Sequence, residues 1–540
     1  MGAVIGKQDR HEKSRSVVSM LAARALAGIL AGLLTGAVAL GVAELAAAII
    51  GPNSAPVIAV GDTAINLTPI PVKDFAITHF GSHDKQALVA GILVMLAGFA
   101  VLIGVLAVRR IGYGLAGLAV FAGLGVTAAL RLPGAGLIDV VPTLTGMTVA
   151  AGTLITLVRS IRPRESRGRP ALFTDGVVAE PGDAGGPGRR RFLAGAAGAA
   201  ALAAAAGGLG DVLLRRFSVA SSRAQVRLPA AAVRAAAVPA GTDLGIAGLT
   251  PFFTSNASFY RVDTDLVLPQ VAPETWTLRI DGMVDREIEI SFAELLRMPL
   301  TETDITLVCV SNQVGGTYAG NARWLGASLP ALLRRAGVRA GADQVLSAAT
   351  DGMTISTPLT TIMHGRPALL AIGMNGQPLP IEHGFPARMI VPGLYGYTSA
   401  TKWVTRLTVT TFAAQRAYWT QRGYAAVAPI HTESRIDVPK PLAQVAAGQV
   451  TVAGVAWAPA TGIAAVQVSA DNGPWHPARL AAADGIDTWR QWVWTWDAAP
   501  GLHTLQVRAT DSKGVTQPSR RAQVFPSGAT GWDSVVVTVT

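Results

Sequence analysis

Long apolar runs separated by short polar segments fill the first 216 residues of the chain. An α-helix needs about 20 apolar residues to cross roughly 30 Å of hydrocarbon, and each run approaches that length. The fifth run is rich in Ala and Gly and only weakly hydrophobic. We predict four membrane-spanning helices within residues 17–160 and a fifth within residues 191–216. The runs cover Leu21–Ile50, Ala87–Val108, Tyr113–Leu130, Val140–Val158 and Phe192–Leu214.

A different pattern begins near Leu249, where apolar and polar residues alternate over short distances around turn sequences such as Asp281-Gly282 and Asp351-Gly352. Alternation with a period of two is typical of strands, and Ser291 is placed to cap a short helix. We predict a compact α+β domain over residues 246–430, preceded by a linker over 217–245. Its predicted strands are Trp276–Ile280, Glu287–Ile290, Ile305–Val310, Val345–Ala348 and Met353–Pro358, and its predicted helices are Ser291–Arg297 and Leu329–Ala336.

The last hundred residues alternate throughout, with turns such as Asp471-Asn472-Gly473 between the runs. Several short strands in a segment of this length indicate an immunoglobulin-like β-sandwich over residues 431–540. Such a domain serves either in binding a partner or in dimerisation. The predicted strands include Gln449–Ala456, Ile463–Ser469, Thr488–Trp496, Gly501–Thr510 and Ser534–Thr540.

The net charge of +11 lies mainly in the apolar half. Residues 1–216 hold 20 Lys/Arg and 12 Asp/Glu, whereas residues 217–540 hold 25 and 22. No basic face is concentrated in the globular half, so nucleic acid is not an expected partner. Basic residues instead flank the apolar runs and predict a cytoplasmic tail over 1–16 and a cytoplasmic loop over 161–190. Five spans then place everything after about Arg216 outside the cytoplasm, in a multi-pass protein of the cell membrane.

Three arginines precede the fifth run, in Arg189-Arg190-Arg191-Phe192-Leu193. This segment is similar to a twin-arginine export signal, which serves the export of folded proteins. The alternative is that these arginines only anchor the topology of the span. Arg215 and Arg216 after the run favour a helix that is retained as an anchor.

The chain has a single cysteine, Cys309, which excludes an intramolecular disulfide. Its thiol is either buried and inert or a metal ligand. None of the eight histidines falls within a predicted span, so a haem held by two histidines inside the bilayer is excluded. They lie at positions 11, 79, 83, 364, 383, 431, 476 and 503.

Two long motifs give the globular half a family resemblance. The first runs Leu307-Val-Cys309-Val-Ser-Asn312 and continues in Gly320-Asn321-Ala-Arg-Trp324-Leu-Gly326. The second is Met374-Asn-Gly-Gln-Pro-Leu-Pro380, followed by His383-Gly-Phe-Pro386-Ala-Arg388-Met-Ile-Val-Pro392-Gly393 and Lys402-Trp403. Residues 250–430 resemble the molybdopterin-binding domain of the sulfite oxidase family, and the terminal β region resembles that family's dimerisation domain.

This resemblance implies a molybdenum–molybdopterin cofactor with Cys309 as the protein ligand of the metal. Molybdenum takes soft thiolate sulfur well, and the pterin phosphate needs cations and hydrogen-bond donors. It implies Tyr424 as a catalytic tyrosine beside the metal. The residues that it assigns to cofactor binding are Asn256, Tyr260, Arg261, Cys309, Asp351, His383, Arg388, Ser399, Ala400, Thr401 and Lys402.

Each assignment has a purely structural alternative. Arg388 can form an ion pair and His383 can be a satisfied core histidine. Asp351 and Asn256 can serve only in turns, and Tyr424 can be a core residue. At the level of the whole protein, the alternative is a binding or scaffold protein that keeps the fold without cofactor; the presence of Cys309 argues against it.

Two positions depart from the family pattern. Sulfite-oxidising members carry arginines where this chain has Ser255 and Val314, and each lost charge-assisted contact to a dianion costs roughly 1.5–3 kcal/mol. We therefore expect two-electron oxygen-atom transfer on a small substrate other than sulfite, such as a sulfoxide, unless another arginine takes over. The available arginines are Arg261, Arg323 and Arg422. Without a haem motif, electrons must pass to a separate electron-transfer partner.

Overall fold

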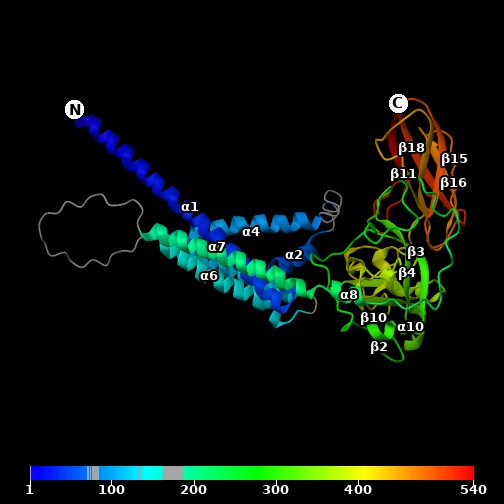
Figure 1. Ribbon diagram of the computed structural model, residues 1–540, viewed down its shortest axis with the longest axis horizontal. Helices are drawn as coiled ribbons and strands as arrows, with labels where there is room; N and C mark the ends of the chain where they lie inside the picture. Colours follow the sequence, from blue (N-terminus) through cyan, green and yellow to red (C-terminus); the bar gives the residue numbers. More distant parts are fainter. Residues whose placement is uncertain (1, 70–71, 73–74, 76–83, 133–134, 162–186) are drawn as a thin grey trace. The chain divides into compact units, whose positions relative to one another are not determined.

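The computed structural model describes residues 2–69, 72, 75, 84–132, 135–161 and 187–540 (Figure 1). It divides into two compact units. The first comprises Met1–Ser218 with Thr264–Val267, and the second comprises Val219–Asp263 with Leu268–Thr540. Each unit is described separately.

The first unit is helical, and five of its helices are long and apolar enough to cross a membrane, as the sequence predicts. Its helices are α1 (Gly2–Ile50), α2 (Pro56–Leu67), α4 (Asp84–Arg109), α5 (Ile111–Arg131), α6 (Val141–Ile161) and α7 (Pro187–Leu214). The short helix α2 was not predicted. The predicted tail over 1–16 is helical from residue 2 and continuous with the first span. Most of the predicted loop over 161–190 lies outside the described residues.

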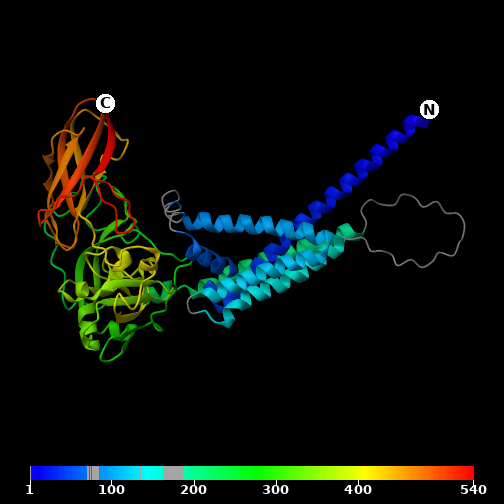
Figure 2. The ribbon, with the colours of Figure 1, turned by 180° about the vertical axis from the view of Figure 1, so that it is seen from behind.

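Small residues let these helices approach closely. Both views show α1, α6 and α7 side by side (Figures 1 and 2). Where α1 meets α4, a Cβ atom added to Gly104 would lie 2.1 Å from the carbonyl oxygen of Gly28. Where α1 meets α7, a Cβ atom on Gly41 would lie 2.7 Å from the carbonyl oxygen of Ala203. Glycine is therefore required at these crossings, as is usual where membrane helices pack without a hydrophobic driving force.

The second unit begins with an α+β domain built on two sheets. One sheet has the order β2-β1-β10-β5-β6, with β10 parallel to β1, and the other has the order β3-β4-β7-β8, with β9 beside β7. The strands of the first are β1 (Thr277–Gly282), β2 (Ile288–Ser291), β5 (Gln344–Ala349), β6 (Thr354–Pro358) and β10 (Val404–Thr410). Those of the second are β3 (Leu300–Val308), β4 (Ala319–Ser328), β7 (Leu369–Met374), β8 (Gln377–Pro378) and β9 (Arg388–Ile390).

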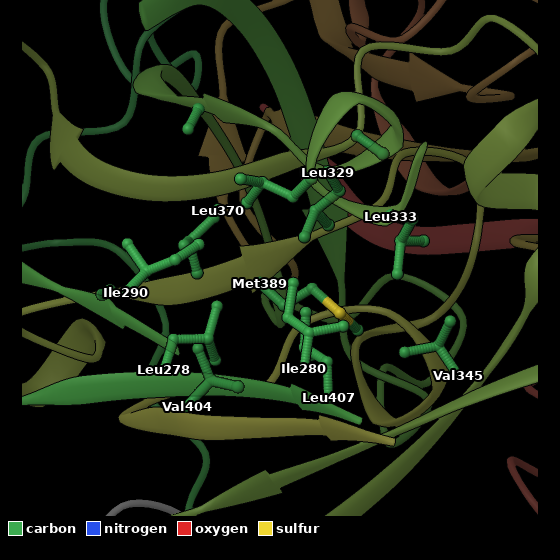
Figure 3. Close-up of a cluster of buried hydrophobic side chains, with 14 of the residues drawn as sticks. Leu278, Ile280, Ile290, Leu329, Leu333, Val345, Leu370, Met389, Val404 and Leu407 are labelled. Atoms are coloured by element: carbon green, nitrogen blue, oxygen red, sulfur yellow. The ribbon is translucent and has the colours of Figure 1, made fainter. Parts of the chain in front are cut away.

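Three short helices complete this domain: α9 (Phe292–Leu295), α10 (Leu329–Ala336) and α11 (Leu359–Met363). The predicted cap is present, since the Ser291 side chain accepts from the amide of Glu294 and the Glu294 carboxylate accepts from the amide of Ser291. Side chains from β1, β7, β9 and α10 converge on one buried cluster, which includes Leu278, Leu370, Met389 and Leu333 (Figure 3). Because β9 reaches into this core, Arg388 at its first residue is held on a rigid element.

The segment predicted as a linker over 217–245 packs against the domain. It contains α8 (Ala220–Gln225), from which the Arg223 guanidinium donates to the carbonyl oxygens of Pro378 and Leu379 at 2.7 Å each. Further on, the amide of Glu302 donates to the carbonyl of Val233 at 2.8 Å. Leu228 contacts the main core cluster.

The C-terminal region is β-rich, as predicted. Two sheets, β11-β13-β17-β16 and β12-β19-β18-β14-β15, share one buried cluster with Trp492 and Val507 on opposite sides of it. The immunoglobulin-like topology stays a prediction. The longer strands are β11 (Glu433–Val438), β13 (Gly448–Trp457), β14 (Ile463–Ala470), β17 (Arg490–Ala498), β18 (Gly501–Asp511) and β19 (Asp533–Val539), and the short ones are β12 (Gln444–Val445), β15 (His476–Pro477) and β16 (Arg479–Leu480).

Candidate active site

Cys309 directly follows β3 and begins the loop that leads into β4. Its amide donates to the carbonyl of Tyr318 at 2.9 Å, and the amide of Asn312 donates to the carbonyl of Cys309 at 3.0 Å. The Asn312 side-chain oxygen also accepts from the amide of Tyr318 at 2.8 Å. These bonds fix the loop, and the cysteine is only 8% exposed.

Burial raises the pKa of the Cys309 thiol, and hydrogen bonds from Ser311 and the charge of Lys402 lower it in part. A coordinating metal would reverse this balance, because a metal-bound thiol is deprotonated outright. Within the described part of the chain, no group of three or more His, Cys, Asp or Glu side chains could hold a metal by itself. A metal at Cys309 would thus need other ligands, and a dithiolene cofactor supplies them.

Arg388 is the most unusual cation of this region, because it is 6% exposed and no carboxylate pairs with it among the described residues. Its two terminal nitrogens donate to the carbonyls of His383 at 3.1 Å and Ala400 at 3.3 Å, and its Nε has no partner in that part of the chain. Burial lowers the pKa of Arg388 to about 10. A buried cation with a spare donor fits an anionic ligand such as a phosphate.

His383 lies in a short 3₁₀ turn (Ile381–His383) just before β9 and is 2% exposed. Its Nε2 is 3.1 Å from the carbonyl oxygen of Asn256. Burial and the nearby charge of Arg388 lower its pKa to about 4, so the ring is neutral at physiological pH. Gly384 follows with φ of +104°, and a Cβ atom there would lie 3.0 Å from the Cα of Lys402. This glycine lets the histidine turn and the lysine segment touch.

Lys402 and Arg261 share one carboxylate. The Lys402 ammonium lies 3.2 Å from Oδ2 of Asp263, and Nε of Arg261 lies 2.7 Å from the same oxygen. Burial lowers the pKa of Lys402 to about 8, against the opposing effect of Asp263. With Arg388, the group holds three basic side chains and one acid, which leaves an excess of two positive charges when all are ionised. That excess matches a phosphate monoester, which carries about −1.5 to −2 near pH 7.

The segment Ser399-Ala400-Thr401 lies between Arg388 and Lys402 in the sequence. Most of its hydrogen-bonding groups bond within the turn that the segment itself forms. The Ser399 hydroxyl donates to the carbonyls of Leu394 and Tyr395, and the amide of Ala400 donates to the carbonyl of Gly396. The hydroxyls of Thr401 and Ser347 bond to each other. Its clearest link to the site is the Ala400 carbonyl, which accepts from Arg388.

Asn256 and Tyr260 are brought to the same place by the segment before β1. Asn256 donates through Nδ2 to the carbonyl of Met374 at 3.3 Å and accepts at Oδ1 from Asn375 at 2.9 Å, so its side chain is tied to the turn between β7 and β8. Burial and the neighbouring Cys309 raise the pKa of the Tyr260 phenol, while Arg388 lowers it. The phenol is therefore a neutral neighbour of both groups.

Asp351 and Tyr424 both make contacts that serve the fold. Asp351 lies in the β5–β6 turn and accepts from the amide of Met353 at 2.9 Å, and the amide of the preceding Thr350 donates to the carbonyl of Trp403. The hairpin tip is thus linked to the residue after Lys402. Tyr424 is buried with its ring against Tyr397, Trp419 and Phe525 at centroid distances of 5.1–5.5 Å.

Sequence reasoning missed two acids of this region. Asp263 bridges the cations described above, and its position two residues after Arg261 was the available signal. Glu433, the first residue of β11, is 3% exposed; its Oε2 accepts from Asn312 at 3.4 Å and its Oε1 is unpaired among the described residues. Burial raises the pKa of Glu433 to about 8. Through Asn312 it connects the C-terminal region to the cysteine loop.

Ser255 and Val314, the two residues that depart from the family pattern, make only local contacts or none that are polar. The hydroxyl of Ser255 accepts from the amide of Ser258 and bonds to its hydroxyl. Val314 is a half-buried residue of the cysteine loop. The arginines that were available as replacements are all engaged: Arg261 with Asp263, Arg323 with Asp304 at 2.7 Å, and Arg422 with the ring and carbonyl of Tyr418.

The chain is similar to known proteins in its globular half. Residues 265–419 match the family model described as the oxidoreductase molybdopterin binding domain. The sulfite oxidase of Gallus gallus is 31% identical over 324 residues, which cover 51% of this chain and 70% of that protein. The mitochondrial sulfite oxidase of Homo sapiens is 29% identical over 328 residues, which cover 51% of this chain and 59% of that protein. An uncharacterized oxidoreductase of Bacillus subtilis is 33% identical over 149 residues, covering 28% and 72%.

Proposed function

This chain belongs to the sulfite oxidase family of molybdopterin-dependent oxidoreductases, and we propose that it is a membrane-anchored enzyme with its molybdenum site outside the cytoplasm. Its cofactor is the molybdenum cofactor of that family. We propose domain boundaries at 246–430 for the cofactor domain and 431–540 for an immunoglobulin-like dimerisation domain. Five apolar helices and the basic residues that flank them support the anchor and the sidedness.

The observation that carries the proposed site is a buried thiol in the same region as two largely buried cations, Arg388 and Lys402, with the more exposed Arg261 sharing the carboxylate of Asp263. Cys309 would ligate the metal, and Arg388, Lys402 and Arg261 would neutralise the pterin phosphate. His383 is neutral, so it can give or accept a hydrogen bond without adding charge, and Asn256 holds it through a backbone carbonyl. Tyr260 lies between the thiol and Arg388 and would line the pocket. Asp351 and the 399–401 turn would support these residues through Lys402 and Arg388.

When bound, the molybdenum cofactor supplies two-electron oxygen-atom transfer, and the protein positions it and excludes competing reactions. Tyr424 is a catalytic candidate because its ring packs on Tyr397. Tyr397 follows Gly396 in a turn near the site. A Cβ atom on Gly396 would lie 3.9 Å from the Tyr260 hydroxyl and 3.8 Å from the carbonyl of Val308. The tyrosine cluster is therefore adjacent to the cysteine loop.

For the substrate, we propose a neutral or weakly charged oxygen donor or acceptor, such as a sulfoxide. Ser255 and Val314 provide no charge for a dianion, and the three nearby arginines are occupied by other groups. An unpaired arginine in a dry pocket would be costly, so a site without a dianionic substrate has no reason to keep one. Electrons would pass to a separate partner, since no described span contains a histidine for haem.

The test compares sulfite with a sulfoxide in steady-state assays of the molybdenum-loaded protein with artificial electron carriers. We expect sulfite oxidation with kcat/KM below about 10⁴ M⁻¹s⁻¹, the low end for ordinary enzymes. Restoring the family arginines in the double variant Ser255→Arg/Val314→Arg should raise sulfite turnover and leave the molybdenum content unchanged. Efficient sulfite oxidation by the wild-type chain would refute the substrate assignment.

A further inference from the structure

Strand β11, the first of the C-terminal region, buries charged side chains on one of its faces. Glu433 is 3% exposed and Arg435 is 5% exposed. Successive residues of a strand point to opposite faces, and Ser434 and Ile436 accordingly have other partners. Ser434 donates to Gln517 at 2.7 Å, and Ile436 lies in the core of the C-terminal region. Charged side chains are rarely buried without partners, so the partners of the charged face show what it serves.

These partners lie in the cysteine loop, which begins at Cys309 and connects β3 to β4. Glu433 accepts from the side-chain amide of Asn312 at 3.4 Å. Arg435 donates to the carbonyl of Gly316 at 2.6 Å. The charged face of β11 therefore bonds to the cysteine loop at two points.

The cysteine loop also fits closely against β19. Gly315 has φ of +74°, and a Cβ atom there would lie 2.4 Å from Oδ1 of Asp533, the first residue of β19. The other oxygen of this carboxylate accepts from the amide of Ile436 at 2.9 Å, so Asp533 is fixed to β11. A side chain at position 315 would push the loop away from both strands.

Asn312 connects the charged face to the metal-ligand position. Its side-chain oxygen accepts from the amide of Tyr318 at 2.8 Å, and its own amide donates to the carbonyl of Cys309 at 3.0 Å. One residue thus joins Glu433 to both ends of the loop. Buried hydrogen-bond networks favour a single arrangement of their members. A displaced Asn312 would change the backbone at Cys309 and, with it, the direction of the sulfur.

We propose that Glu433 and Arg435 are positioning residues, through which the C-terminal region sets the orientation of the Cys309 sulfur toward the metal. The inference rests on the proposed function of Cys309 as the ligand, and it gives the C-terminal region a role besides dimerisation. Residues that orient a metal ligand without touching the metal typically change metal affinity or activity 10- to 100-fold when they are removed.

The first test measures the rate at which N-ethylmaleimide alkylates Cys309 in cofactor-free, full-length protein, followed by intact mass. Cys309 is the only cysteine of the chain, so this rate reports on the cysteine loop. Glu433→Leu keeps a similar volume and removes the acceptor. We expect it to raise the rate about fivefold, the effect of one neutral hydrogen bond.

Two further variants serve as controls. Glu433→Gln keeps an acceptor oxygen and should react like the wild type; it is a close mimic at pH 7, because burial raises the pKa of Glu433 to about 8. Ser434→Ala loses a buried hydrogen bond on the opposite face of the same strand and should also react like the wild type.

Arg435→Lys tests the second contact independently, in case Glu433→Leu does not fold. Lysine keeps a cation beside Asp437 but lacks the planar group that donates to Gly316. This variant should also raise the alkylation rate.

The second test compares the thiolate-to-molybdenum charge-transfer absorption of the cofactor-loaded proteins at equal molybdenum content. We expect a shifted or weaker band in Glu433→Leu and an unchanged band in Glu433→Gln and Ser434→Ala. An unchanged band in Glu433→Leu would overturn the proposal, as would wild-type alkylation rates in both Glu433→Leu and Arg435→Lys.

Equal gains in alkylation rate by Glu433→Leu and Ser434→Ala, with equal losses of Tm, would show that β11 contributes only to stability and would also overturn the proposal. A wild-type protein without molybdenum refutes the proposed function. A molybdenum-loaded wild type whose variants show no change refutes only this inference.

Discussion

Replacing Arg388 by Met should cost the cofactor-free protein little stability while greatly weakening cofactor binding. The side chain is buried without a carboxylate partner among the described residues, and burial lowers its pKa to about 10. Each pH unit by which a pKa falls corresponds to about 1.4 kcal/mol, so the penalty on the charged form is on the order of 3 kcal/mol. Two hydrogen bonds to carbonyls, at roughly 1.5–3 kcal/mol each, offset it. Met has a similar length, and we expect a change within about 1 kcal/mol.

Arg435 provides a matched control. It is as deeply buried as Arg388, but its Nε lies 2.8 Å from Oδ1 of Asp437, and it also donates to Gly316 and Thr250. Breaking such a pair leaves an uncompensated buried carboxylate and costs about 3–5 kcal/mol. Arg435→Met should therefore destabilise the cofactor-free protein strongly, where Arg388→Met does not.

The assay is thermal unfolding in detergent of full-length protein made without cofactor, followed by tryptophan fluorescence. All 11 Trp lie after residue 275, so the signal reports on the second unit. At roughly 2–4 °C per kcal/mol, Arg435→Met should lose about 6 °C or more and Arg388→Met at most a few degrees. Cofactor retention should fall about 10- to 100-fold in Arg388→Met. Equal loss of Tm in both variants would show that Arg388 serves the fold and is not held ready for an anion.

Other predictions follow from the buried acid and from the topology. Burial raises the pKa of Glu433 to about 8, so the folded state binds more protons than the unfolded state between about pH 4.5 and 8, and its stability should fall by up to about 1.4 kcal/mol per pH unit as pH rises through that window. Glu433→Gln should flatten this dependence in denaturant titrations, and an unchanged slope would exclude Glu433 as its source. Reporter fusions after Leu249 should behave as exported, and a cytoplasmic signal would mean a miscounted span. Changing Arg189 and Arg190 to Lys should block export if they form a twin-arginine signal, whereas normal export would leave them as topology anchors.

Periodicity in the sequence was sufficient for the elements that face solvent on one side. The hairpin of β1 and β2 and the strands β14 and β18 lie within one or two residues of their predicted bounds. β7 was missed because all six of its residues are buried, which leaves no alternation to detect. The packed segment over 217–245 was missed for another reason: its contacts, such as Arg223 with Pro378, join residues far apart in the chain.

In the candidate site, too, local sequence predicted some residues, and contacts between distant residues were not predicted. The long motifs carried Cys309, His383, Arg388 and Lys402, and the structure brings all four together. The motifs did not contain the acidic residues that lie near these side chains in the fold. Asp263 lies 139 residues from Lys402 and Glu433 lies 121 residues from Asn312, so only the fold reveals these contacts. The spare donor of Arg388 likewise becomes visible only when its neighbours are known.

Metal analysis of the purified full-length protein tests the central claim most directly. We expect one molybdenum per chain, and loss of the metal in Cys309→Ser, because an alkoxide is a poor replacement for a thiolate ligand. The serine variant should keep its Tm in the cofactor-free state, since the buried thiol is neutral there. Tightly bound molybdenum at undiminished content in Cys309→Ser would contradict the assignment of Cys309 as the metal ligand, and a wild-type protein without molybdenum would contradict the proposed enzyme.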